Sequence, residues 1–144
     1  MTAHERTGWR DQQISERHRI WGFNCPAVDL DFLMVEYNLG APVALVEYKD
    51  RRARKPDLNH ATYRAINQLA NIAELPFLIA FYWPECWAFR VSPVNARAKL
   101  VYRGDILLTE RRFVKSLYHL RGLKIEEQVY RQLNTSLPSE AEVA

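Results

Sequence analysis

The stretch that decides the fold reads VDLDFLMVEY (28–37), NLG (38–40) and, two residues later, VALVEYK (43–49). The two longer segments are rich in β-branched and aromatic residues, which favour strands. The Asn-Leu-Gly segment between them is typical of a turn. The sequence therefore predicts a β-hairpin in which a three-residue loop places Tyr37 opposite Ala41.

The register of this hairpin gathers charged residues on one face. Continuing the ladder from the loop puts Asp31 opposite Glu47. The next alternate pair is Asp29 and Lys49, so all four side chains project from the same side of the strands. A slip of one residue would place Phe32 opposite Glu47, which argues against it. The other face is apolar and suits packing against a helix; it carries Leu30, Phe32, Met34, Val46 and Tyr48.

Three carboxylates among strand-forming residues are costly to bury unless positive charge lies among them. Lys49 can neutralise one of them. A divalent cation could neutralise the others, because carboxylate oxygens are ligands that Mg²⁺ and Mn²⁺ prefer. The same residues also fit a solvent-facing hairpin with cross-strand ion pairs, and spacing alone leaves both interpretations open.

A helix is predicted before the hairpin and another after it. The first covers residues 7–19 and is capped by Thr7. The second begins at Asn59 or His60 and runs to about residue 75, where Pro76 stops it. Its apolar face is expected to consist of Ala65, Leu69 and Ile72.

The remainder of the chain completes an α/β fold. The continuous apolar run at 77–82 is typical of a strand buried on both faces, and residues 87–91 pair back with it. Residues 93–105 are expected to be irregular, with a short strand at 99–102. Two helices then follow, at 109–120 and 125–133. This order predicts a mixed sheet of about four to five strands flanked by helices.

Composition fits one domain over residues 1–138, followed by a disordered acidic tail at 139–144. Hydrophobic residues make up 48% of the 144 residues and charged residues 26%, which excludes wholesale disorder. The two cysteines, Cys25 and Cys86, are far apart, the first twenty residues are polar, and the longest apolar run is 76–84. These features favour a cytoplasmic protein without a membrane anchor.

Basic residues are concentrated in two stretches, although the net charge is only +3. Residues 49–64 hold six basic and two acidic side chains, and residues 97–124 hold eight basic and two acidic ones. Such local excesses suit a polyanionic partner such as a nucleic acid.

The pattern of Asp31, fifteen intervening residues and then Glu47-Tyr48-Lys49 resembles the PD-(D/E)XK nuclease superfamily, which has the restriction-endonuclease-like fold. The likeness covers roughly residues 5–92: a helix, the hairpin, a helix that carries Gln68, and a buried strand. The segments WRD (9–11), RHR (17–19) and CPAVDLDF (25–32) also look like small uncharacterised proteins of phages and bacteria.

The resemblance implies metal-dependent hydrolysis of DNA phosphodiester bonds, as an endonuclease or exonuclease. Asp31, Glu47 and the backbone carbonyl of Tyr48 would hold Mg²⁺ or Mn²⁺. No proline directly precedes Asp31, whereas Pro26 lies three residues before Asp29, so Asp29 is the second candidate ligand. The position opposite Glu47 favours Asp31.

Further roles follow from the same resemblance. Lys49 would orient or deprotonate the attacking water and stabilise the charge that builds on the phosphate. Gln68 would contact DNA or order a water, and Glu16 from the first helix is a possible additional ligand. DNA phosphates would be bound by Arg51, Arg52, Arg54 and Lys55, with Arg17 and Arg19.

Two further expectations concern activity and assembly. The alternative function is a catalytically silent DNA-binding or phage assembly protein that keeps the fold. A homodimer is expected if both strands of a duplex are cut.

Overall fold

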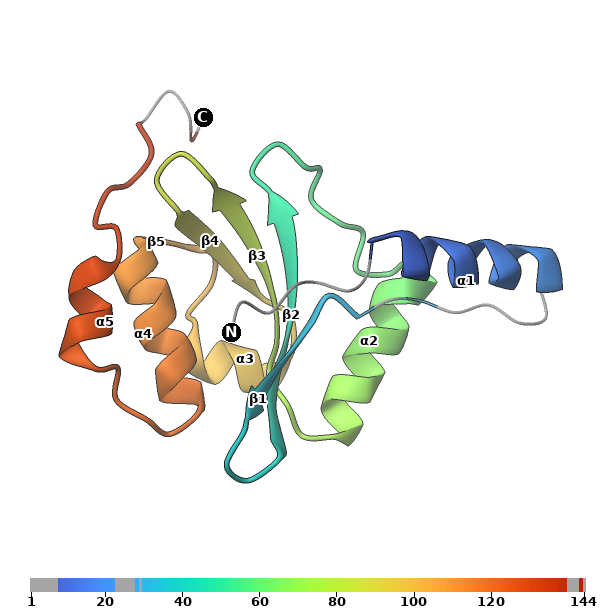
Figure 1. The fold of residues 1–144 in the computed structure, drawn as a ribbon, viewed down its shortest axis with the longest axis horizontal. Helices are drawn as coiled ribbons and strands as arrows, with labels where there is room; N and C mark the ends of the chain where they lie inside the picture. The colour runs from blue at the N-terminus through green and yellow to red at the C-terminus, as the bar shows by residue number, and fades with distance from the viewer. Residues whose placement is uncertain (1–7, 23–27, 29, 140–142, 144) are drawn as a thin grey trace.

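The structure is a computed structural model of the chain, and it describes residues 8–22, 28, 30–139 and 143. These residues form five helices and five strands (Figure 1). In chain order they are α1 (Gly8–Trp21), β1 (Phe32–Glu36), β2 (Ala41–Asp50), α2 (Ala61–Ile72), β3 (Phe77–Trp83), β4 (Ala88–Pro93), α3 (Ala96–Val101), β5 (Ile106–Leu108), α4 (Glu110–Leu120) and α5 (Glu127–Gln132).

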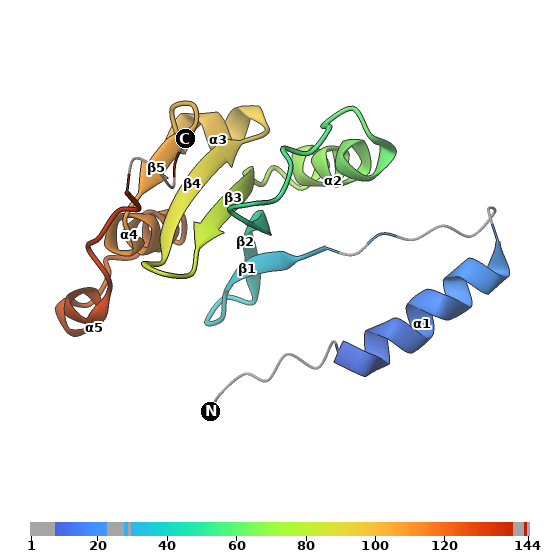
Figure 2. The same ribbon diagram turned by 90° about the horizontal axis from the view of Figure 1, so that it is seen from above.

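The five strands form one mixed sheet in the order β1-β2-β3-β4-β5. β2 and β3 are parallel and are joined by the crossover helix α2, whereas the other neighbouring pairs are antiparallel. Figure 2 shows α2 on one side of the sheet and α4 on the other. The α/β class and the mixed sheet flanked by helices are therefore confirmed.

Each face of the sheet has its own apolar cluster. On the α2 side, Ile66 and Ala70 of the helix pack against Leu45, Phe77 and Ile79 of the strands. On the α4 side the cluster contains Phe113 together with Val46, Leu78, Ala80, Phe89, Val91 and Tyr102. Since alternate residues of β2 and β3 enter opposite clusters, the central strands are buried on both faces, as predicted for residues 77–82.

The hairpin register is the predicted one from Phe32 to Met34, and it differs near the turn. Phe32 pairs with Val46 and Met34 with Ala44, which are the expected partners. Nearer the turn the register shifts by one residue, so that Val43 has no partner and Glu36, rather than Tyr37, lies opposite Ala41. The turn consequently covers residues 37–40 instead of 38–40.

Helix α2 presents a different face to the sheet from the one predicted. Ile66 and Ala70 are buried, whereas Leu69 and Ile72 are exposed, Ile72 by 82%. The sequence pattern is compatible with burial of either face, the one with Leu69 and Ile72 or the one with Ile66 and Ala70. Packing selected the one with the small Ala70, which lets the helix approach the strands closely. The start is as predicted: His60 caps the helix, its Nδ1 accepting a hydrogen bond from the Thr62 backbone N–H.

The segment from 93 to 108 was also predicted incorrectly. Residues 96–101 form helix α3 where a short strand at 99–102 was expected. The Asn95 side chain stabilises its start by accepting from the Ala98 backbone N–H, and also accepts from the Phe77 N–H. The fifth strand lies slightly later, at Ile106–Leu108, and forms the sheet edge.

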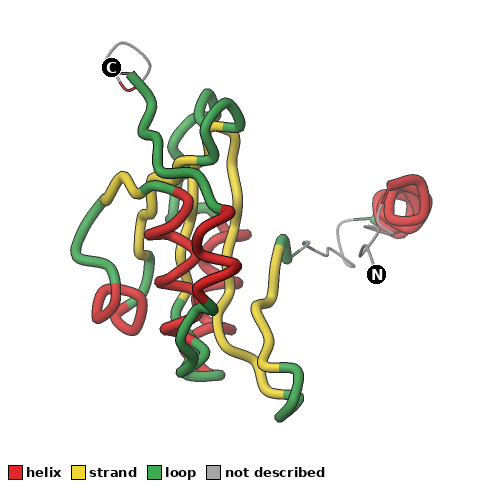
Figure 3. Tube along the Cα trace, turned by 60° about the vertical axis from the view of Figure 1, so that its left-hand side comes forward, coloured by secondary structure: helices red, strands yellow, loops and turns green. Residues whose placement is uncertain are grey.

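Helix α1 lies apart from the sheet and the other helices (Figures 2 and 3). Its Ile14, Ile20 and Trp21 are exposed. The predicted cap Thr7 lies outside the described residues, as do Cys25 and most of the predicted tail. None of the helices described here has the length and apolar character needed to cross a membrane.

Candidate functional site

Asp31 and Glu47 line the same small cavity where the hairpin meets α2. Its volume is about 10 Å³. Its wall combines these two carboxylates with apolar side chains and backbone of β1, β2, α2 and β3; the other lining residues are Leu30, Phe32, Leu45, Val46, Ile66 and Phe77.

The Asp31 carboxylate is bound to the backbone of β2. Its Oδ2 accepts a hydrogen bond of 3.2 Å from the Tyr48 N–H. The backbone ladder with β1 ends at Phe32, and the Asp31 side chain therefore takes the place of the next partner. In an antiparallel ladder the N–H and C=O of one residue face the same neighbouring strand. The Tyr48 carbonyl consequently faces the side of β2 on which Asp31 lies.

One carboxylate oxygen of Glu47 has polar partners, and the other has none among the described residues. Oε1 accepts from the Tyr63 hydroxyl at 3.1 Å and lies 3.4 Å from Lys49 Nζ. Oε2 is buried and has no hydrogen-bond partner among the described residues. Because a buried carboxylate oxygen without a donor or cation is costly, this atom marks the place where a positive or hydrogen-bonding group fits.

Lys49 is held between Glu47 and Tyr63. Partial burial of the ammonium acts to lower its pKa, but the hydrogen bond with Tyr63 and the charge of Glu47 outweigh this effect and raise the pKa of Lys49. Its Nζ lies 5.8 Å from the centre of the Tyr63 ring. Lys49 is thus a cation at neutral pH, fixed beside the carboxylates.

Tyr63 is a site residue that the sequence interpretation missed. It lies on the inward face of α2, one turn before Ile66 and Asn67, and it contacts both Glu47 and Lys49. The available signal was the correct inward stripe of α2, because a tyrosine on that stripe necessarily faces β2. Asn67, also missed, has a buried Oδ1 without a partner among the described residues.

Gln68 does not join this group. It is exposed, and at 3.6 residues per turn it lies roughly 140° around the helix axis from Tyr63. The resemblance implied that Gln68 contacts DNA or orders a water, and the structure places it on a different face of α2 from Tyr63. The inward polar residues of this helix are Tyr63 and Asn67 instead.

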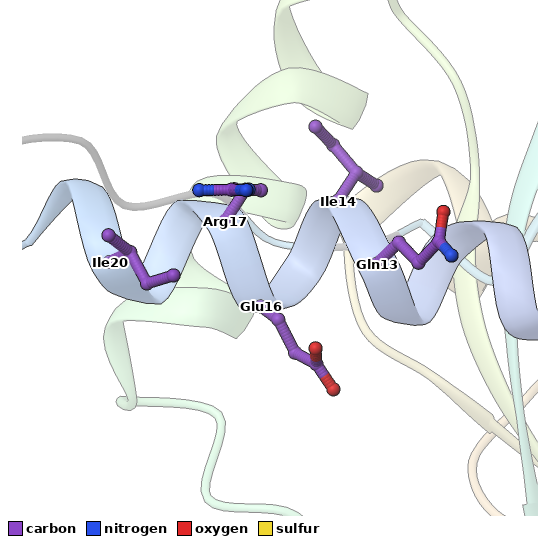
Figure 4. A pocket seen from close by; sticks show the side chains of 5 residues that line it. All are labelled: Gln13, Ile14, Glu16, Arg17 and Ile20. Carbon is purple, nitrogen blue, oxygen red and sulfur yellow. The ribbon is translucent and has the colours of Figure 1, made fainter.

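Glu16 and Arg17 lie on α1, away from Asp31 and Glu47. Figure 4 shows them beside a separate pocket along this helix, lined also by Gln13, Ile14 and Ile20. The structure therefore does not bring Glu16 to the carboxylates. The side chains of Asp29 and Arg19 lie outside the part of the chain that is described.

The basic segment after β2 is largely paired within the molecule. Arg51 forms an ion pair with Glu85 at 3.1 Å, and Arg52 forms one with Asp50 at 3.1 Å. Lys55 lies 4.0 Å from Asp105. Arg54 is exposed and has no ion pair within the described residues. A phosphate would have to compete with these acids for three of the four basic groups.

The donor set fits Mg²⁺ or Mn²⁺. The described residues contain no group of three His, Cys, Asp or Glu side chains placed to hold a metal. Mg²⁺ nevertheless keeps several waters and needs only one or two carboxylates. Asp31 and Glu47 supply two hard anionic oxygens beside one cavity, and the orphaned Glu47 Oε2 is without a partner there.

Comparison with known proteins adds no assignment: no family model, curated protein or solved structure matches this chain. The geometry of the two carboxylates and the lysine is therefore what a functional proposal has to rest on.

Proposed function

We propose that this protein is a metal-dependent deoxyribonuclease of the PD-(D/E)XK type. The observation that carries the proposal is the buried Glu47 Oε2, which has no partner although its carboxylate lines one cavity with Asp31. Lys49 follows two residues later on the same face of β2 and contacts the same carboxylate. Two acids and one lysine in this arrangement suit hydrolysis of a phosphodiester bond.

Each residue has a defined role in this proposal. Asp31, Glu47 and the Tyr48 carbonyl would hold Mg²⁺ or Mn²⁺, and the bound ion would supply Lewis-acid activation of the phosphate and of water. The Lys49 ammonium points its protons at the charge that builds on the phosphate and positions the water. Tyr63 keeps Glu47 and Lys49 in place by bonding to both.

The basic segment supplies DNA contacts next to this centre. Arg51 follows Lys49 by two residues, and Arg52, Arg54 and Lys55 continue from it. Backbone phosphates attract such side chains without regard to base sequence. The proposal therefore includes DNA as the partner, and it retains the cytoplasmic location that the sequence favours.

One observation favours the alternative of a catalytically silent DNA-binding or assembly protein. Lys49 already pairs with Glu47 at 3.4 Å, and the cavity beside the carboxylates is small, about 10 Å³. In that case Lys49 is a structural counter-charge and has no chemistry to perform.

Measuring DNA cleavage by the Lys49→Met variant distinguishes these two functions. Linear duplex, single-stranded and branched DNA are incubated with Mg²⁺ or Mn²⁺, and DNA affinity is measured in EDTA. A catalytic Lys49 predicts a rate loss of about 10²–10³ with the fold and most of the affinity retained, since this is the usual cost of losing one electrostatic donor. Lys115→Met, an exposed lysine of α4, is the matched control and should cut like the parent.

A structural Lys49 predicts the opposite pattern. The melting temperature of Lys49→Met would then fall, and there would be no cleavage to lose. A parent protein that is inert on every DNA form with either metal would refute the nuclease proposal.

A further inference from the structure

Arg90 lies in the same row of the sheet as Lys49. The register pairs Lys49 with Phe81 across β2 and β3, and Phe81 with Arg90 across β3 and β4. Two strand spacings separate the backbones of Lys49 and Arg90, or roughly 10 Å. The row therefore places a second cationic residue within reach of a ligand at Lys49.

Arg90 also faces the same side of the sheet as Lys49. Its neighbours Phe89 and Val91 belong to the apolar cluster on the α4 side, and strand side chains alternate between faces. Its guanidinium lies over the ring of Trp83, with Cζ 5.6 Å from the ring centre. Trp83 is 3% exposed, so this ring is a fixed support.

Arg90 differs from the other cations of this end of the sheet in having no acid. Lys49 has Glu47, and Arg51 has Glu85. Arg90 is half-buried and forms no ion pair or hydrogen bond with its side chain among the described residues. A guanidinium without an acid beside it can accept an incoming anion without first breaking an ion pair.

Its position over the Trp83 ring suits Arg90 for a phosphate. A guanidinium held beside an aromatic ring keeps N–H groups at its outer edge, where two of them can bind two oxygens of one phosphate. Trp83 limits the rotation of the side chain, so less conformational freedom is lost when the anion binds.

We propose that Arg90 binds a backbone phosphate of the nucleic acid. This phosphate is the neighbour, along the same strand, of the phosphate that reaches Lys49. This inference rests on the proposed function, since it uses the phosphodiester at Lys49 to place its neighbour. Arg90 is thus a substrate-positioning residue that sets where the strand crosses β3 and β4.

The test is DNA affinity in EDTA, measured against salt concentration by fluorescence anisotropy of a labelled oligonucleotide. Arg90→Gln should weaken binding by roughly ten- to a hundredfold, the usual cost of losing a hydrogen bond to a charged group. It should also reduce the slope of log affinity against log salt by about 1. Arg90→Lys should keep the slope but bind more weakly than the parent, because a lysine cannot form the bidentate contact.

The control is Arg131→Gln, an exposed arginine of α5 that pairs with Glu127 and should leave affinity and slope unchanged. Melting temperatures show whether each variant is folded. If Arg90→Gln does not fold, Arg90→Lys, which keeps a long aliphatic side chain beside Trp83, serves as the test variant. A folded Arg90→Gln or Arg90→Lys that binds as the parent does would overturn the inference, as would a parent with no DNA affinity. A parent that binds but does not cut refutes the nuclease proposal alone.

Discussion

One backbone N–H, that of Tyr48, determines where the Asp31 carboxylate lies. The 3.2 Å hydrogen bond keeps this side chain at the edge of β2, beside the cavity that Glu47 shares. Two negative charges consequently face one small space, and within the described part of the chain Glu47 has a cationic neighbour, Lys49, whereas Asp31 has none. Repulsion between the two carboxylates is relieved when a cation binds or when one charge is removed.

Replacing either carboxylate by its amide should therefore abolish metal binding without unfolding the protein. Isothermal titration calorimetry at neutral pH should show Mn²⁺ binding by the parent and none by Asp31→Asn or Glu47→Gln. Without metal, Asp31→Asn should be as stable as the parent or more stable, because one of two like charges is gone. Glu47→Gln also loses the charge that is paired with Lys49, so it should be the less stable of the two variants. Glu127→Gln, on exposed α5, serves as the control. Undiminished Mn²⁺ binding by the double variant would place the metal elsewhere.

Separation along the chain explains why part of the site could be predicted and part could not. Asp31, Glu47 and Lys49 lie on one hairpin, so strand alternation and local register bring them together. Tyr63 and Arg90 reach the same face through a crossover helix and two further strands. Their positions depend on long-range packing, which no short sequence pattern encodes.

At the scale of elements, the hairpin shows which force sets a register. The expected loop length was wrong by one residue, yet Phe32 still pairs with Val46. The apolar face decides the pairing, because Phe32 packs edge-on against Tyr48, and Tyr48 against Phe113 of α4. Sliding β1 by one residue would expose this aromatic contact. For α2, by contrast, two stripes were comparably apolar, and only contact with the sheet distinguished them.

The end of β1 is tied to the end of α4 through Glu36. Its Oε2 accepts from Arg121 Nη2 at 2.7 Å, and its Oε1 accepts from the Asn38 N–H at 3.0 Å. The hydrogen bond from Arg121, followed by that from Asn38, lowers the pKa of Glu36 below its usual 4.5. A carboxylate with a lowered pKa in the folded state stabilises the fold above its unfolded pKa. This contribution disappears as the pH falls through the folded pKa.

Glu36→Gln should for this reason flatten the acid side of the stability profile. Melting temperatures measured from pH 7 down to pH 3 should fall less for Glu36→Gln than for the parent. In the parent the contribution of Glu36 declines below the usual pKa of 4.5 and is lost as the pH falls through the lowered folded-state pKa. At pH 7 the variant should be the less stable of the two. Parallel profiles for the two proteins would show that this ion pair does not link the hairpin to α4.

At the scale of the whole molecule, the sheet separates an apolar packing layer from the face that carries the proposed site. Its α4 side is a packed apolar layer in which Phe89 and Phe113 stack with ring centres 4.1 Å apart. Its α2 side carries Glu47, Lys49 and, two strands away, Arg90. The exposed Arg112 and Lys115 of α4 therefore lie on the far side from the proposed site.

This division predicts which of the two basic stretches binds DNA. Replacing Arg51, Arg52, Arg54 and Lys55 together by glutamine should weaken binding and flatten its salt dependence, because fewer counterions are released. Replacing Arg112 and Lys115 by glutamine should leave both quantities unchanged. Filter binding between 50 and 200 mM salt, or roughly that range, resolves such slopes. The reverse result would assign DNA binding to α4.

The unpaired Val43 has a consequence for how this chain can vary in evolution. The irregularity lies between the turn and the carboxylates, so it separates the length of the turn from the pairing of Phe32 with Val46. A one-residue deletion at Val43 would regularise the ladder and leave Asp31 beside Tyr48. A chain with one residue fewer between the aspartate and the glutamate could thus keep the same strand pairing and the same pair of carboxylates.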